Sequence, residues 1–191
     1  LSRVWRDPLV LTRLREVVDI LLNPLYAEPG KLHLVARRDW TPVRGGLSFG
    51  HDAEAAHLVI DAAKQLDDWP NPETLRKCKA LIDFALQHGW DQRNGGITYW
   101  GDWLGNVTDS TKNWWAGAES LLGLATMYRE TNDPTYRDYA ERQWEFLARH
   151  QIDHQHGGWD QTVSPSGIVI GDDVWLAAGV RVLDGVTIAD G

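Results

Sequence analysis

Residues 84–96 read FALQHGWDQRNGG and residues 146–158 read FLARHQIDHQHGG, so one pattern occurs twice at a spacing of 62 residues. In each copy a Phe, a His, an Asp and a Gly-Gly pair hold the same places. An Asp or Asn side chain accepts backbone N–H groups at a helix start, and a proline at the first helical position needs no N–H partner. Such pairs open amphipathic stretches at Asp7-Pro8, Asn71-Pro72 and Asp133-Pro134, which therefore predict three helices.

Two more helices are expected between these, from His51 to about Leu66 and from Trp114 to about Glu130. A helical hairpin that repeats every 60-odd residues is longer than a tetratricopeptide or HEAT unit. It suits an α/α toroid, in which inner and outer helices alternate around a central cavity. The chain is therefore predicted to be mainly α, a partial (α/α)6 toroid of helical hairpins over residues 1–167, with too few hairpins to close the ring.

The last stretch, residues 168–191, reads IVIGDDVWLAAGVRVLDGVTIADG and differs in character. Apolar residues recur there every six positions, at Ile170, Leu176, Val182 and Ile188. This pattern resembles the left-handed β-helix of hexapeptide-repeat acyltransferases. We expect a separate hexapeptide-repeat (left-handed β-helix-like) tail, little more than one coil long, which is too short to bury a core by itself.

Composition restricts the class of partner. The formal net charge is -8, with 27 acidic against 19 basic residues, which argues against nucleic acid because phosphate binding needs clustered Lys and Arg. The chain has 11 Trp, and flat indole rings stack well on sugars. No apolar run is long enough to span a bilayer. We expect a carbohydrate partner, no nucleic acid, no membrane and, with one cysteine, a cytoplasmic location.

Because the first residue is Leu1, the chain is expected to begin inside a longer gene product.

Residues 48–55, SFGHDAEA, open one of the expected inner helices. His51 and Glu54 are three residues apart, so they share a helix face that would line the cavity, and a histidine beside a carboxylate suits acid/base chemistry. This stretch resembles the Gly-His-Asp-Ile-Glu-Ala motif of the N-acylglucosamine 2-epimerase and cellobiose 2-epimerase family. Residues 112–119, KNWWAGAE, are similar to the family's Lys-x-Trp-Trp-x-Gln-Ala-Glu motif. The resemblance covers residues 8–167, the C-terminal half of the family's six-hairpin barrel.

The resemblance implies proton chemistry at C2 of a mono- or disaccharide with a free reducing end, through a cis-enediol and without metal or cofactor. His51 would be one of two histidine acid/bases, as suits an imidazole whose pKa is ordinarily near neutral. By the same resemblance, Glu54 and Glu119 would bond sugar hydroxyls or tune the histidine. Trp115, with Trp114, would stack on a sugar ring. Asp52 is taken as a further substrate-binding residue.

The chain also departs from the family pattern. Nothing matches the segment that carries the second acid/base histidine, Gly117 replaces a glutamine, and His57 stands where a tryptophan is common. The predicted function is thus a truncated or chimeric epimerase or aldose-ketose isomerase with impaired activity, and the open barrel edge predicts self-association.

Three other interpretations stay open on the sequence. The first is that the chain is a sugar-binding fragment without turnover. The second is that it is a glycosidase that uses paired carboxylates among Asp52, Glu54, Asp109 and Glu119. Least favoured is an acyltransferase remnant, because the tail contains no histidine. The zinc-like spacing of His150, His154 and His156 is interpreted as a repeat position followed by a polar loop, so no metal site is expected.

Overall fold

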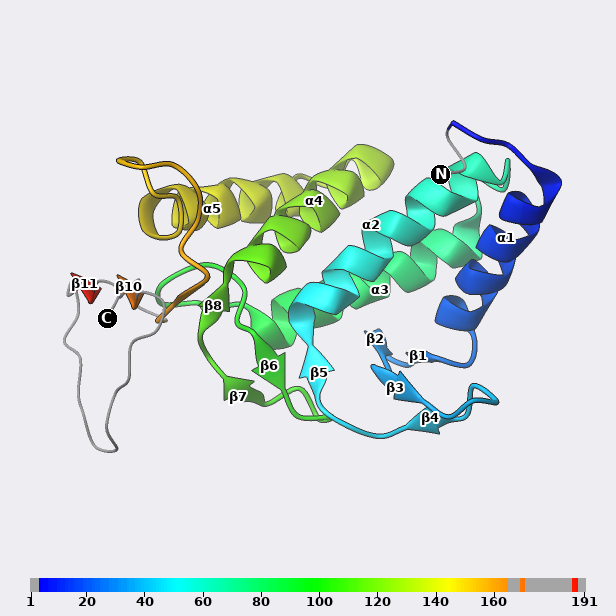
Figure 1. Ribbon diagram of the computed structural model, residues 1–191, viewed down its shortest axis with the longest axis horizontal. Coiled ribbons are helices and arrows are strands. Elements are labelled where there is room, and N and C mark those ends of the chain that lie inside the picture. The colour runs from blue at the N-terminus through cyan, green and yellow to red at the C-terminus, as the bar shows by residue number, and fades with distance from the viewer. Residues whose placement is uncertain (1–3, 165–168, 171–186, 189–191) are drawn as a thin grey trace.

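The computed structural model describes residues 4–164, 169–170 and 187–188 of the chain. Five helices dominate it, and short strands connect them (Figure 1). The helices are α1 (Pro8–Leu22), α2 (Phe49–Gln65), α3 (Pro72–Gly89), α4 (Trp114–Thr131) and α5 (Pro134–His150). The strands are β1 (Tyr26–Ala27), β2 (Lys31–Leu32), β3 (Val35–Ala36), β4 (Pro42–Val43), β5 (Leu47–Ser48), β6 (Trp100–Gly101), β7 (Val107–Asp109), β8 (Lys112–Asn113), β9 (Thr162–Val163), β10 (Val169–Ile170) and β11 (Thr187–Ile188).

All three Asx-Pro pairs start helices, as predicted. The side chains of Asp7, Asn71 and Asp133 accept backbone N–H groups of the first turns of α1, α3 and α5, and proline is the first helical residue each time. The two remaining helices are capped by Ser48 and Asn113. Because Ser48 is the cap, α2 begins at Phe49, two residues earlier than expected.

The helices form two hairpins beside α1. α2 packs against both α3 and α4, and α4 packs against α5, so α2 and α4 are the inner pair (Figure 1). One buried cluster joins α2, α3 and α4 through Ala53, Ile60, Ile82, Leu124 and Met127, among others. α1 adds a smaller contact with α2.

Small residues let the inner helices approach closely where they begin. A Cβ at Gly50 would lie 2.6 Å from the Cβ of Ala116, so only glycine fits this crossing. Phe49 is fully buried, and Gly89 and Gly101 pack directly against its ring. This second cluster fixes the start of α2 against the end of α3 and the strand β6.

The strands gather at the end of the molecule where α2 and α4 begin, as Figure 1 shows. β5, β6 and β7 form an antiparallel sheet, in which Leu47 pairs with Gly101. β8 and β9 pair in a second sheet. Both inner helices therefore start directly from a strand, and their first residues are held in register at this end.

The repeated Asp and Gly-Gly residues form the same turn in both copies. After α3, the Oδ1 of Asp91 accepts the N–H groups of Arg93 and Asn94, and after α5 the Oδ1 of Asp153 accepts those of Gln155 and His156. The Gly-Gly pairs at 95–96 and 157–158 all have positive φ, a conformation that glycine adopts without the steric cost of a Cβ.

Most of the predicted hexapeptide tail lies outside the described residues. The parts that are described are β10 and β11, which pair in parallel with Val169 opposite Thr187, while β10 also pairs with β9. The boundary at residue 167 and the hexapeptide repeat stay predictions. None of the helices in the described part of the chain is both long and apolar enough to cross a membrane.

Candidate active site

His51 lies in the first turn of α2, where the local structure orients its ring. Its Nδ1 lies 2.7 Å from the hydroxyl of Ser48, the residue that caps the helix. Its ring packs edge-on to Trp115 of α4, with the centroids 4.6 Å apart. A tautomer that carries its proton on Nδ1 donates to the Ser48 hydroxyl and leaves the lone pair on Nε2, so the same helix cap presents a base.

A cavity of about 280 Å³ opens beside this histidine. Most of its wall is apolar, from leucines of α1, α2 and the strand segment, and its polar groups are His51, Glu54 and His33. Glu54 forms no hydrogen bond or ion pair with any other described residue, so its carboxylate is available within this cavity. An apolar hollow with a few polar groups is the usual form of a small-molecule site.

His33 was not identified from the sequence. Its ring stacks on Trp103 at 4.1 Å between centroids. Burial holds the pKa of His33 below the ordinary value for histidine, and the nearby cations Arg44 and Lys31 lower it further. The hydrogen bond with the Val43 backbone opposes this shift. No spacing signal pointed to it, because the short strands β2 and β3 bring it to the cavity through tertiary contacts alone.

Glu119 of α4 does not accompany His51. Its Oε2 lies 2.6 Å from Nε2 of His57 on α2, and the Glu119 side chain is 31% exposed against 9% for the histidine. The two inner helices are thus joined by an imidazole–carboxylate pair, and the second carboxylate oxygen of Glu119 remains for other partners. Sequence reasoning noted the histidine as a departure from the family motif but missed this pairing.

Asp52 has an environment different from the one expected. It is 1% exposed, its Oδ1 accepts the Leu32 N–H at 3.1 Å, and burial raises the pKa of its carboxyl well above the ordinary range. The Leu32 N–H and the Lys31 cation oppose that rise. Asp52 thus ties β2 to α2 through the Leu32 N–H. The substrate-binding role expected for Asp52 stays a prediction.

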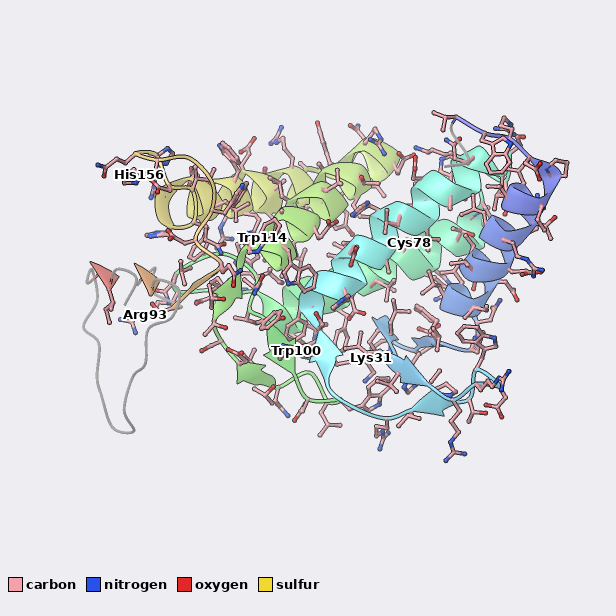
Figure 2. The ribbon with its side chains drawn as sticks, viewed as in Figure 1. Lys31, Cys78, Arg93, Trp100, Trp114 and His156 are labelled. Atoms are coloured by element: carbon pink, nitrogen blue, oxygen red, sulfur yellow. The ribbon has the colours of Figure 1, made fainter. Side chains whose placement is uncertain are left out.

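The two adjacent tryptophans point to different places. Trp115 is half-buried against His51, whereas Trp114 is exposed at the start of α4 (Figure 2) and its ring lies near Trp159 at 6.2 Å. Consecutive helical residues differ by about 100° around the axis, so the two rings have different neighbours, and the binding role expected for Trp114 stays a prediction. Trp115 is the one placed beside His51.

Gly117, the other departure from the family motif, faces the neighbouring outer helix. A Cβ there would lie 2.7 Å from Leu147 and 3.0 Å from Gln143, both on α5. A larger side chain at 117 would therefore require the Leu147 and Gln143 side chains to shift.

Lys112 lies in β8, directly before α4, and stabilises the start of that helix. It is 1% exposed, and its Nζ donates to the Asp91 carboxylate at 3.0 Å and to the carbonyls of Gly95 and Gly96. Burial lowers the pKa of this lysine, and Asp91 opposes that shift. The lysine thus joins the repeated turn after α3 to the helix that carries Trp115 and Glu119.

The remaining candidates have separate local partners. Asp109 accepts the N–H and hydroxyl of Thr111, as a turn residue does. His150 packs against Phe146, His154 hydrogen-bonds the Ala148 carbonyl, and His156 contacts Asp153. Among the described residues, no three His, Cys, Asp or Glu side chains are arranged to hold a metal ion.

The model of the family described as N-acylglucosamine 2-epimerase matches residues 11–178. The chain belongs to that family. A cellobiose 2-epimerase from Bacteroides fragilis is 27% identical over 91% of this chain and 44% of its own length. A D-mannose isomerase from Marinomonas mediterranea is 36% identical over 60% of this chain and 28% of its own. The chain thus spans less than half the length of these epimerase-family relatives.

Solved structures of the family confirm the predicted helical-hairpin fold. A cellobiose 2-epimerase from Spirochaeta thermophila superposes with a TM-score of 0.75 at 30% identity, over 86% of this chain and 41% of its own. A D-mannose isomerase gives 0.76 at 26%. Cellobiose 2-epimerases are (α/α)6 barrels, so the chain has the fold of part of such a barrel. A glycoside hydrolase of family 76, at a TM-score of 0.54 and 21% identity, shares only the fold.

Proposed function

We propose that this chain carries acid/base chemistry for epimerisation or isomerisation of a reducing sugar at C2. The observation that supports it most is His51, held by Ser48 and Trp115 at the mouth of a cavity that also contains the free carboxylate of Glu54. The related enzymes that are named for their substrates act on cellobiose and on mannose. The activity and its substrate are proposals, because the chain corresponds to less than half of each relative.

The proposed step is a proton transfer. Nε2 of His51 takes the proton from C2 of the open-chain aldose, the C–H electron pair forms the C1=C2 bond, and the carbonyl oxygen takes a proton from solvent to give a cis-enediol. Protonation of C2 by solvent on the opposite face, with loss of the proton of the C1 hydroxyl, gives the epimer. Protonation of C1, with loss of the proton of the C2 hydroxyl, gives the ketose. A group with a pKa near neutral serves both directions.

The other residues have binding roles in this proposal. The Glu54 carboxylate accepts a hydrogen bond from a sugar hydroxyl, and Trp115 presents its ring to the sugar. Glu119 bonds a hydroxyl through the oxygen that His57 leaves free, so His57 is a positioning residue for that carboxylate. Orientation of this kind contributes to rate because it fixes the reacting groups in advance.

The test is proton NMR of mannose, N-acetylmannosamine and cellobiose with the protein in heavy water. We expect the C2 proton signal of at least one sugar to disappear, because a proton taken by His51 exchanges with solvent. His51→Phe keeps an aromatic ring against Trp115 but removes the base, and should abolish the exchange. His156→Ala, at an exposed turn, is the matched control and should leave it unchanged.

The products distinguish the remaining interpretations. A new epimer signal indicates 2-epimerisation, and ketose signals indicate isomerisation. Saturable sugar binding without C2 exchange would overturn the proposed catalysis and favour a sugar-binding fragment. Release of free sugar from a glycoside would favour a glycosidase instead.

A further inference from the structure

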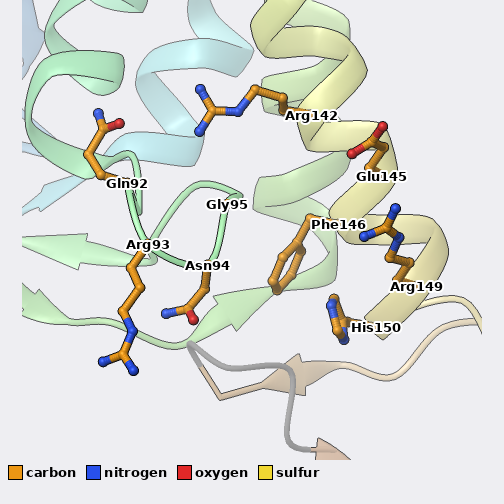
Figure 3. Close-up of a pocket in the computed structure, with 9 residues that line it drawn as sticks. All are labelled: Gln92, Arg93, Asn94, Gly95, Arg142, Glu145, Phe146, Arg149 and His150. Atoms are coloured by element: carbon orange, nitrogen blue, oxygen red, sulfur yellow. The ribbon is translucent and has the colours of Figure 1, made fainter.

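A second hollow lies away from the candidate active site, between the turn after α3 and the outer face of α5 (Figure 3). Its volume is about 220 Å³. Arg93 comes from the turn, and Arg142, Glu145 and Arg149 come from α5, around the ring of Phe146. We call this hollow the arginine pocket, after Arg93, Arg142 and Arg149.

The charge in the arginine pocket is unbalanced. Three arginine residues and one glutamate, Glu145, line it, and no ion pair joins any of these four side chains to a partner in the described part of the chain. The nearby carboxylate of Asp91 is already bound by Lys112. Of the nine other arginines in the described part of the chain, five form ion pairs with carboxylates and four, Arg15, Arg37, Arg38 and Arg44, do not; the paired ones are Arg6, Arg13, Arg76, Arg129 and Arg137. A net positive hollow in a chain of net charge -8 therefore calls for an anionic partner.

One of the three guanidinium groups is already held in place. Arg142 lies over the rings of Trp90 and Tyr139, at 5.0 and 5.3 Å from their centroids. Stacking uses the flat face of a guanidinium and leaves the N–H groups at its edge free to donate. An anion that binds there does not have to order this side chain.

The internal repeat shows that the fold does not require the two arginines of α5, whereas the counterpart of Arg93 is Lys31, which is also basic. The positions of α3 that match Arg142, Glu145 and Arg149 at the 62-residue offset are Ala80, Asp83 and Gln87. The structural members of the repeat are kept, because Phe84 contacts His88 as Phe146 contacts His150.

The equivalent space beside α3 is also filled. A Cβ at Gly30 would clash with the Ala80 backbone, because it would lie 2.1 Å from the carbonyl oxygen. The chain at Gly30 therefore packs directly on α3. Beside α5 the turn also contacts the helix, because Gly96 packs against the Phe146 ring, but a hollow lined by Arg93, Arg142 and Arg149 remains next to that contact. The arginine pocket thus occurs at one copy of the repeat and not at the other. A structural role in the repeat therefore does not explain it.

We propose that the arginine pocket binds the phosphate group of a small phosphate ester. The planar guanidinium fork matches a phosphate with paired N–H···O bonds, and several such groups around one hollow bind it from more than one side. The volume exceeds that of a phosphate, which leaves room for a small organic part beside Asn94 and Glu145. This inference does not depend on the function proposed for His51.

The test is an amide NMR titration of the protein with inorganic phosphate, with glucose 6-phosphate and with uncharged glucose. We expect saturable shifts of the amides of residues 93–95 with both phosphates, at concentrations on the order of millimolar, and none with glucose. Arg142→Gln and Arg149→Gln should each weaken binding by about tenfold, and Glu145→Gln should strengthen it. Arg137→Gln, on the same helix but paired with Asp138, is the matched control.

Tighter binding of glucose 6-phosphate than of phosphate would support an ester as the ligand, and equal binding would support recognition of the phosphate alone. The proposal is overturned if neither phosphate gives saturable shifts in the wild type. It is also overturned if Arg137→Gln weakens binding as much as the pocket substitutions, because that pattern indicates general surface charge. The amide spectrum of each variant reports directly whether it is folded.

Discussion

The most deeply buried cation in the described structure, Lys112, illustrates what a single residue contributes. Its Nζ bonds one carboxylate and two carbonyls, so its removal takes a charged, buried donor away from all three acceptors. We predict that Lys112→Met lowers the free energy of unfolding by about 3 kcal/mol, because a buried charge loses its partner. Urea unfolding followed by tryptophan fluorescence measures this. Lys79→Met, at the surface pair with Asp83, should cost less than about 1 kcal/mol.

Asp52 predicts a specific dependence of stability on pH. Burial raises the pKa of its carboxyl in the folded chain, so the folded state binds its proton more tightly than the unfolded state does. The stabilisation is complete below the unfolded pKa of about 3.9 and is lost as the pH rises through the folded pKa. Asp52→Asn keeps an oxygen for the Leu32 N–H and cannot ionise.

We therefore expect the stability of Asp52→Asn relative to wild type to increase with pH above about 4. Unfolding curves at several pH values for the two proteins measure the difference. A difference that stays constant from pH 4 to 8 would show that Asp52 ionises normally in the folded chain.

Helix starts were predictable because each depends on a few neighbouring residues. Asp7, Asn71 and Asp133 accept N–H groups within their own first turns, so the Asx-Pro signal needs no distant contact. The start of α2 was displaced by two residues, since Ser48 caps it from the end of β5 and Phe49 is drawn into the core. Its first turn depends on packing as well as on local sequence.

The cap of α3 gives a prediction at this scale. The side chain of Asn71 accepts the N–H groups of Glu73 and Thr74, both at 3.1 Å. Asn71→Ala leaves these donors without their partner and should lower the free energy of unfolding by about 1 kcal/mol. Asn71→Asp keeps the acceptor and should change it by much less. Equal losses in the two variants would contradict a capping role.

At the scale of the whole molecule, one side of the inner helix pair is uncovered. Leu58 of α2 is 50% exposed and Val17 of α1 is 52% exposed, and both line an apolar groove between these helices. Contiguous apolar surface of this kind favours association. The self-association predicted from an open barrel edge thus has a physical location, although it stays a prediction.

We expect sedimentation velocity to show association that increases with protein concentration. Leu58→Gln should reduce it, because the substitution places an amide in the groove without disturbing a buried contact. Leu104→Gln is the control, since Leu104 is 75% exposed in a loop away from the groove. A protein that stays monomeric at all concentrations would contradict the prediction.

The amino-acid sequence by itself determined the helical hairpins, the Asx-Pro caps of α1, α3 and α5, the repeated Asp and Gly-Gly pattern and the family. These features arise from hydrogen bonds and periodicity within a few residues, so they can be identified without knowledge of the fold. It also identified His51, Glu54, Trp115 and Glu119 as site candidates. Only the tertiary structure decided their partners, because contacts between helices depend on which small residues let α2 and α4 approach. It paired Glu119 with His57, enclosed Asp52 behind β2, brought His33 to the cavity and gathered three arginines on one side of α5.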